Sequence, residues 1–111
     1  MEILNSKIFG ENLSSTPLLV FHGLFGMLDN WGTFGKDFGE FVPTHLIDLR
    51  NHGRSFHSDE MSHDDLADDI LRYMDHYGIE KAHILGHSLG GKAVMQFAIK
   101  YPEKVEKLIV V

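Results

Sequence analysis

Short, continuously apolar segments alternate with longer segments of helical periodicity, and this alternation restricts the fold more than any other feature of the chain. Strands of this kind are predicted at residues 18–23, 44–48, 81–86 and 104–111, and an opening strand at residues 2–9. A strand that is apolar throughout is buried on both faces, as happens in a parallel sheet covered by helices on both sides. We therefore predict an α/β protein with a mostly parallel sheet and helices on both faces.

Three helices are predicted between these strands. The first, at about residues 30–41, is weakened by its glycines. The second begins at Ser62, where Asp65 three residues later approximates a capping box, and Gly78 is a natural C-terminal stop. The third covers residues 89–101, because Pro102 ends it.

The composition of the 111 residues excludes several classes of protein. The formal net charge of −6 argues against a nucleic-acid partner, which would need clustered Lys and Arg. The chain contains no cysteine, so it has neither a disulfide framework nor a cysteine zinc site. The sequence shows no signal peptide and no apolar run of membrane-spanning length, and we expect a cytoplasmic protein without membrane contact.

The final predicted strand, residues 104–111, has nothing after it to cover its outer edge. An apolar sheet edge is an aggregation liability, and full α/β domains commonly run to about 200–250 residues. We expect residues 1–111 to form the N-terminal part of a single larger domain.

The segment "AHILGHSLGGKAV" places Ser88 between a strand and a helix, inside the pattern G-x-S-x-G. A turn this sharp needs glycine at its flanking positions, and it holds the serine hydroxyl out above the sheet. The start of the following helix supplies N–H groups that stabilise an oxyanion. Ser88 is therefore the candidate nucleophile; the alternative is a glycine-rich turn whose serine only caps the helix.

A second motif, "HGLFG", follows the strand at residues 18–23. A loop of this type brings a backbone N–H close to a reacting carbonyl group. The N–H of Leu24 is the first candidate donor, with that of Phe25 as the fallback, and the N–H of Leu89 is the second donor. An ordinary glycine turn is the alternative.

Together, "HGLFG", "DLRNHGRS" and "GHSLGG" resemble the α/β-hydrolase superfamily, most closely the small bacterial YbfF-type serine esterases. The resemblance covers residues 18–111. It implies that Ser88 is the nucleophile, that residues 22–26 form the oxyanion loop and that residues 48–55 form the loop after the second buried strand. It also implies a histidine base, an acid and a substrate-covering cap that follow the serine, and we expect these in a C-terminal remainder of the same protein.

A histidine within the chain is a weak substitute for that base. We expect the side chain of His87 to point away from the Ser88 hydroxyl and His22 to brace the oxyanion loop. His52 could approach the edge of the site. The remaining five are expected to be structural: His45, His57, His63, His76 and His83.

Two charged features have simpler explanations than ligand binding. An acidic, histidine-bearing run spans residues 57–65, but it lacks H-E-x-x-H and any i, i+4 histidine pair, so no metal and no cofactor are predicted. Arg50 could contact an anionic substrate; we expect it to tie its loop to a carboxylate such as Asp48.

The sequence thus predicts a serine hydrolase that cleaves small-molecule carboxylic esters, incomplete for catalysis without the remainder. Four side chains could line one wall of its pocket or simply pack in the core: Phe25, Met27, Leu28 and Trp31. The first alternative is a non-catalytic module of hydrolase type that binds a ligand or partner. The second is another activity of the same fold, such as thioesterase, C–C hydrolase or haloperoxidase. The oligomeric state, acyl chain length and leaving group are left open.

Overall fold

The computed structural model describes residues 2–111, so Met1, the first residue of the predicted domain, lies outside the described residues. Its centre is a five-stranded sheet in the order β1-β3-β2-β4-β5, in which only β1 is antiparallel to its neighbour. The strands are β1 (Ser6–Phe9), β2 (Leu18–Phe21), β3 (Thr44–Ile47), β4 (Ala82–Gly86) and β5 (Val105–Val110). The predicted mostly parallel α/β sheet is confirmed.

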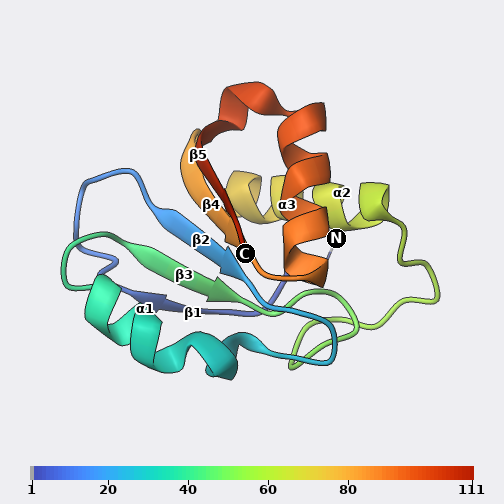
Figure 1. Cartoon of the computed structure of the whole chain (residues 1–111). Coiled ribbons are helices and arrows are strands. Elements are labelled where there is room, and N and C mark those ends of the chain that lie inside the picture. Colours follow the sequence, from blue (N-terminus) through green and yellow to red (C-terminus); the bar gives the residue numbers. More distant parts are fainter. Residues whose placement is uncertain (1) are drawn as a thin grey trace.

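Helices cover both faces of this sheet (Figure 1). Helix α1 (Gly32–Phe38) lies on one face, preceded by the short 3-10 helix η1 (Leu28–Trp31). Helices α2 (His63–His76) and α3 (Leu89–Lys100) pack against each other on the opposite face, and η2 (Pro102–Lys104) leads into β5. The first predicted helix is therefore divided in two and ends three residues earlier than expected.

The core has two layers because successive side chains of a strand point to opposite faces. Leu19 and Phe21 of β2 join the large cluster beneath α2 and α3. Leu18 and Val20 of the same strand join a smaller cluster beneath η1 and α1. This division explains why β2 is apolar at every position.

The ends of α2 confirm the predicted signals. The side chain of Ser62 accepts a hydrogen bond from the N–H of Asp65, and the Asp65 carboxylate accepts one from the N–H of Ser62. Gly78 follows the helix with a φ of +66°, a conformation that glycine adopts without strain. The helix is thus fixed at both ends by its own sequence.

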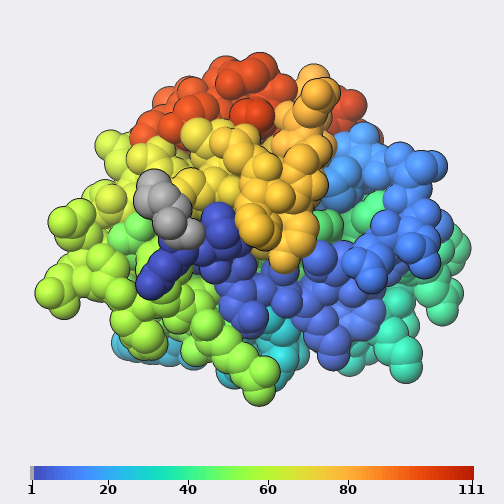
Figure 2. Space-filling view, turned by 180° about the vertical axis from the view of Figure 1, so that it is seen from behind, coloured from blue at the N-terminus to red at the C-terminus, as the bar shows by residue number. Residues whose placement is uncertain are grey.

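Strand β5 is the exposed edge of the sheet, and each of its residues after Val105 is exposed. Beside it lies an apolar groove between α1 and the sheet, lined partly by Leu85, Phe34 and Ile109. The segment that follows β3 (residues 48–62) lies beside the residues at the start of β1, as the view from behind shows (Figure 2). The N–H of Asn5 donates to the hydroxyl of Ser55 in this segment. Within residues 2–111, the structure shows no helix with the length and apolar character needed to span a membrane.

Candidate active site

The carboxyl ends of β2 and β4 meet at the point where the order of the strands reverses. Strand β2 lies between β3, which follows it in the chain, and β4, which pairs with its opposite edge. At the carboxyl ends of β2 and β4, Phe21 lies opposite Gly86. In open α/β sheets, ligands bind outside the carboxyl ends of the strands at such a point. The HGLFG loop (His22–Gly26) and the turn containing Ser88 both begin here.

Ser88 lies on a sharp turn between β4 and α3, with φ +55° and ψ −114°. A non-glycine residue in this region of backbone space is strained. The turn is closed by glycines that allow the backbone to approach closely. A Cβ at Gly86 would lie 2.3 Å from the Gly90 carbonyl oxygen, and one at Gly90 would lie 2.3 Å from the Phe21 carbonyl oxygen. Only glycine fits at both positions.

The side chain of Ser88 is not engaged as a helix cap. The residue is exposed, and although it occupies the N-cap position of α3, its hydroxyl makes no capping hydrogen bond. A Cβ at Gly23 would lie 3.3 Å from the Ser88 Cβ, which places the HGLFG loop directly beside this serine. The alternative interpretation of Ser88 as a simple helix cap therefore has no hydrogen bond to support it.

The HGLFG loop is braced from below by His22, which is 1% exposed. Its Nε2 accepts a hydrogen bond from the N–H of Leu49 at 3.0 Å, so the proton is on Nδ1, which donates to the Gly23 carbonyl oxygen at 2.8 Å. Burial lowers the pKa of His22, which keeps the ring neutral and able to accept. His22 thus joins this loop to the end of β3.

Some backbone N–H groups of the site already donate a hydrogen bond within the protein, and others have no acceptor among the described residues. The N–H of Phe25 donates to Nε2 of His52 at 3.0 Å, and the N–H of Gly26 donates to the Gly23 carbonyl oxygen at 2.9 Å. No acceptor among residues 2–111 pairs with the N–H of Leu24 or Leu89. The Leu89 N–H also stands at the first turn of α3, where the helix dipole favours negative charge.

Neither His22 nor His52 has a ring nitrogen free to act as a base. Both ring nitrogens of His22 are engaged, and so are those of His52, whose Nδ1 lies 2.9 Å from the Arg50 carbonyl oxygen. His87 is exposed, and its ring lies edge-on to Trp31 with 6.3 Å between centroids.

Arg50 ties its loop to a carboxylate, as expected, but the partner is Asp69 and not Asp48. The Arg50 guanidinium makes two hydrogen bonds, of 2.7 and 2.8 Å, to the carboxylate of Asp69 on α2, and Asp69 also pairs with Arg72. The carboxylate is 2% exposed, and a bidentate guanidinium is the partner that a buried carboxylate requires. Arg50 therefore fastens its loop to a helix 19 residues further along the chain.

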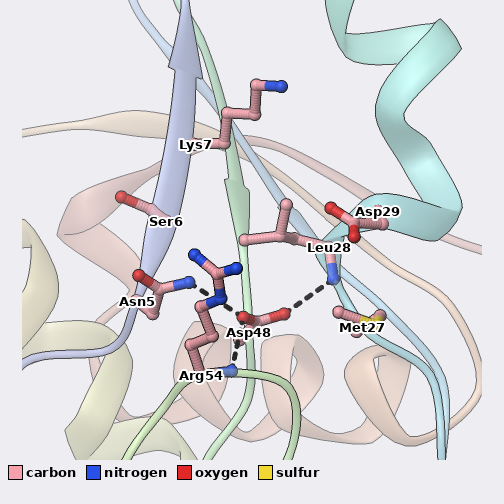
Figure 3. Close-up of a pocket in the computed structure, with 8 residues that line it drawn as sticks. All are labelled: Asn5, Ser6, Lys7, Met27, Leu28, Asp29, Asp48 and Arg54. Atoms are coloured by element: carbon pink, nitrogen blue, oxygen red, sulfur yellow. Dashed lines mark hydrogen bonds between the residues drawn. The ribbon is translucent and has the colours of Figure 1, made fainter.

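Asp48 instead fastens the start of η1 to the N-terminal residues and to the segment that follows β3 (Figure 3). One carboxylate oxygen accepts the N–H of Leu28 at 2.7 Å, and the other accepts the N–H of Arg54 and the amide of Asn5, both at 3.0 Å. The residue is 1% exposed and forms one wall of a polar pocket whose rim includes Lys7. Asn5, Leu28 and Asp48 come from three segments that are far apart in the sequence.

The acidic run at residues 57–65 has structural partners. Asp65 closes the capping box, and Asp64 accepts a hydrogen bond from Gln96 of α3. Within residues 2–111, no three His, Cys, Asp or Glu side chains gather in a metal-binding arrangement.

The four side chains considered for a pocket wall separate into two pairs. Leu28 is buried in the core beneath α1, and Trp31 packs against it. Phe25 and Met27, together with Leu24 and Met61, line an open cavity of about 420 Å³. Phe25 is 91% exposed, so its ring is available to a ligand. Met61 was not anticipated, because its place depends on the path of the segment after β3.

Comparison with known proteins agrees with this geometry. The chain is 46% identical over 98 residues to a Haemophilus influenzae protein named as an esterase/lipase, a match that covers 87% of this chain and 34% of that protein. It is 36% identical to esterase YbfF of Escherichia coli, over 88% of this chain and 39% of that enzyme. A solved marine microorganism esterase superposes with a TM-score of 0.94 at 41% identity, covering 99% of this chain and 41% of that one.

The chain thus spans between about a third and two fifths of the length of these relatives. Residues 16–111 match the family described as alpha/beta hydrolase fold. The resemblance first suggested by the three motifs is thereby confirmed over nearly the whole chain, and the chain belongs to the alpha/beta hydrolase fold family.

Proposed function

We propose that Ser88 is the nucleophile of a serine hydrolase that cleaves small-molecule carboxylic esters. The observation that carries this proposal is the strained backbone of an exposed serine, φ +55° and ψ −114°, at the carboxyl end of β4 beside the HGLFG loop. Strain of this kind persists only where the surrounding structure imposes it, and it is concentrated at reactive sites. The relatives named as esterases support the choice of substrate class.

In the proposed reaction, the Ser88 hydroxyl oxygen attacks the acyl carbon while a base takes its proton. The negative charge that develops on the carbonyl oxygen is stabilised by the unpaired N–H groups of Leu24 and Leu89. The C–O bond then breaks, the alcohol leaves with a proton, and the acyl group remains on Ser88. Water activated by the same base releases the acid and restores the serine.

The base and the acid that orients it are proposed to lie outside these 111 residues, in the same protein. The ring nitrogens of His22 and His52 are already hydrogen-bonded, so neither is free to accept the serine proton. We further propose that residues 1–111 are the N-terminal part of one hydrolase domain. The exposed edge β5 and the apolar groove beside it support this, since such surfaces are normally covered.

The proposed setting is the cytoplasm and the proposed partner a small molecule. The formal net charge of −6 argues against nucleic acid as the partner. No cofactor is required for the acyl transfer described.

The test is hydrolysis of p-nitrophenyl esters by the complete natural protein and by its Ser88→Ala variant. Loss of the nucleophile is expected to lower kcat by roughly 10⁶-fold, to the background of the assay. Ser14→Ala is the matched control, because Ser14 lies in an exposed loop and should leave kcat unchanged. Intact-mass analysis after treatment with a fluorophosphonate should show one adduct, absent from Ser88→Ala.

Other outcomes separate the alternatives. Turnover that survives Ser88→Ala would overturn the assignment of the nucleophile. A protein that forms the adduct but cleaves only thioesters or C–C bonds would keep Ser88 and replace the substrate class. A protein with neither adduct nor turnover would favour the non-catalytic ligand-binding module.

A further inference from the structure

Phe25 has an unusual backbone conformation for its residue type. Its φ is +62°, a region that bulky residues rarely adopt, and its ring is 91% exposed, so core packing does not hold it there. Its N–H, by contrast, is held by a specific acceptor, Nε2 of His52, at 3.0 Å. The conformation of the HGLFG loop therefore depends on a side chain that comes 27 residues later in the chain.

The hydrogen bonds of His52 fix which of its nitrogens carries the proton. Nδ1 lies 2.9 Å from the Arg50 carbonyl oxygen, which only accepts, so Nδ1 carries the proton and donates it. Nε2 then presents a lone pair, which the Phe25 N–H requires. The imidazole is 8% exposed and packs against the His22 ring at 5.1 Å between centroids.

His52 is itself held by a rigid element. Arg50, whose carbonyl oxygen orients the imidazole, is tied by its guanidinium to the buried carboxylate of Asp69 on α2 and to the Glu60 carbonyl oxygen at 2.7 Å. A continuous series of contacts thus runs from α2 through Arg50 and His52 to the peptide between Leu24 and Phe25. Its last member is the peptide adjacent to the one that bears the unpaired Leu24 N–H.

We infer that His52 is a positioning residue that determines which N–H of the HGLFG loop faces the reacting carbonyl oxygen. By taking the Phe25 N–H as its own partner, it turns that peptide toward the segment after β3. The Leu24 N–H is thereby left as the donor beside Ser88. This inference rests on the proposed function, because it assigns a role within the same oxyanion site.

The test compares two substitutions of His52, each of which can keep one of the two hydrogen bonds that its imidazole makes. His52→Asn keeps a donor for the Arg50 carbonyl oxygen but is too short to accept from Phe25, whereas His52→Gln places an acceptor near the position of Nε2. In the complete natural protein, we expect His52→Asn to lower kcat by ~10- to 100-fold with KM within ~3-fold, because oxyanion contacts act in the transition state. His52→Gln should retain kcat within ~5-fold. His57→Asn, in the same loop and exposed, is the control.

A second readout does not depend on turnover. With ¹⁵N labelling, a coupling across the N–H···N hydrogen bond should link the Phe25 amide nitrogen to His52 Nε2, and it should vanish in His52→Asn. Absence of this coupling in the natural protein would overturn the inference, and so would an unchanged kcat in His52→Asn. An equal loss of kcat in both variants would show a purely structural role and would also overturn it. If the coupling is present but Ser88→Ala leaves turnover intact, the proposed function fails and the inference fails with it.

Discussion

Replacing Asp48 by asparagine tests how strongly this carboxylate holds the start of η1 to Asn5 and Arg54. The two side chains have nearly the same shape, so the change isolates charge and hydrogen bonding. Asp48 is 1% exposed and accepts three hydrogen bonds, from the N–H of Leu28, the N–H of Arg54 and the amide of Asn5 (Figure 3). An asparagine has one oxygen and one NH₂ group, and the latter faces donors only.

The magnitude follows from these contacts. A hydrogen bond to a charged acceptor contributes about 1.5–3 kcal/mol, and a buried donor left without a partner costs about 1–3 kcal/mol. Asparagine can satisfy the Leu28 N–H or the Arg54 N–H, but not both, and only with neutral hydrogen bonds. Because such losses are not additive, we expect the free energy of unfolding to fall by about 2–4 kcal/mol. That is roughly a 30- to 700-fold change in the unfolding equilibrium.

The assay is urea unfolding of the natural protein and its variants, followed by circular dichroism. Asp29→Asn is the matched control, because Asp29 lines the same pocket but is exposed, and its replacement should change stability by less than about 0.5 kcal/mol. If Asp48→Asn and Asp29→Asn differ by less than about 1 kcal/mol, the argument that the Asp48 carboxylate holds η1, Asn5 and Arg54 together is refuted.

Two further predictions concern the turn at Ser88 and the far end of the sheet. Gly90→Ala would place a Cβ 2.3 and 2.6 Å from two backbone carbonyl oxygens, so unfolding measurements should show a loss above about 2 kcal/mol, or no folded protein; Gly32→Ala, with nothing within 4 Å, should change stability by less than about 1 kcal/mol. Burial lowers the pKa of His45 to about 4, and its C–H resonance in an NMR titration should report that midpoint. The unfolded chain takes up the proton first, so His45 should cause stability to fall between pH 6.5 and 4, by at most about 3 kcal/mol. In His45→Gln the fall should be smaller, since His22, whose pKa burial also lowers, still contributes to it. A midpoint near 6.5 would contradict this account of His45.

The fold was predictable because its signals are local. The apolar runs at β2, β3 and β4 identify strands buried on both faces, and Ser62 with Asp65 identifies the start of α2. The sequence predicts β1 less well. This strand is shorter than the predicted residues 2–9, and nothing in its sequence indicates that it runs antiparallel to β3. The pairing partner of a short, half-buried edge strand is decided by tertiary contacts.

The site was predictable in its backbone and less so in its side chains. The glycines around Ser88 indicate a tight strand-to-helix turn, since no other residue fits. The partners of Arg50 and His52 were not predictable, because they lie 19 and 27 residues away and depend on the path of two irregular loops. Phenylalanine rarely adopts the left-handed conformation, so the sequence does not indicate it at Phe25. The conformation is explained only by the hydrogen bond from the Phe25 N–H to His52.

The order of the strands has a consequence for synthesis on the ribosome. β2 is made early and lies at the centre of the sheet, yet one of its two partners comes much later: Phe21 pairs with Gly86, which is synthesised 65 residues afterwards. At about 5–20 residues per second, that interval is roughly 3–13 s. During it, an apolar strand with one unpaired edge is present on the nascent chain, and such an edge can pair with another chain.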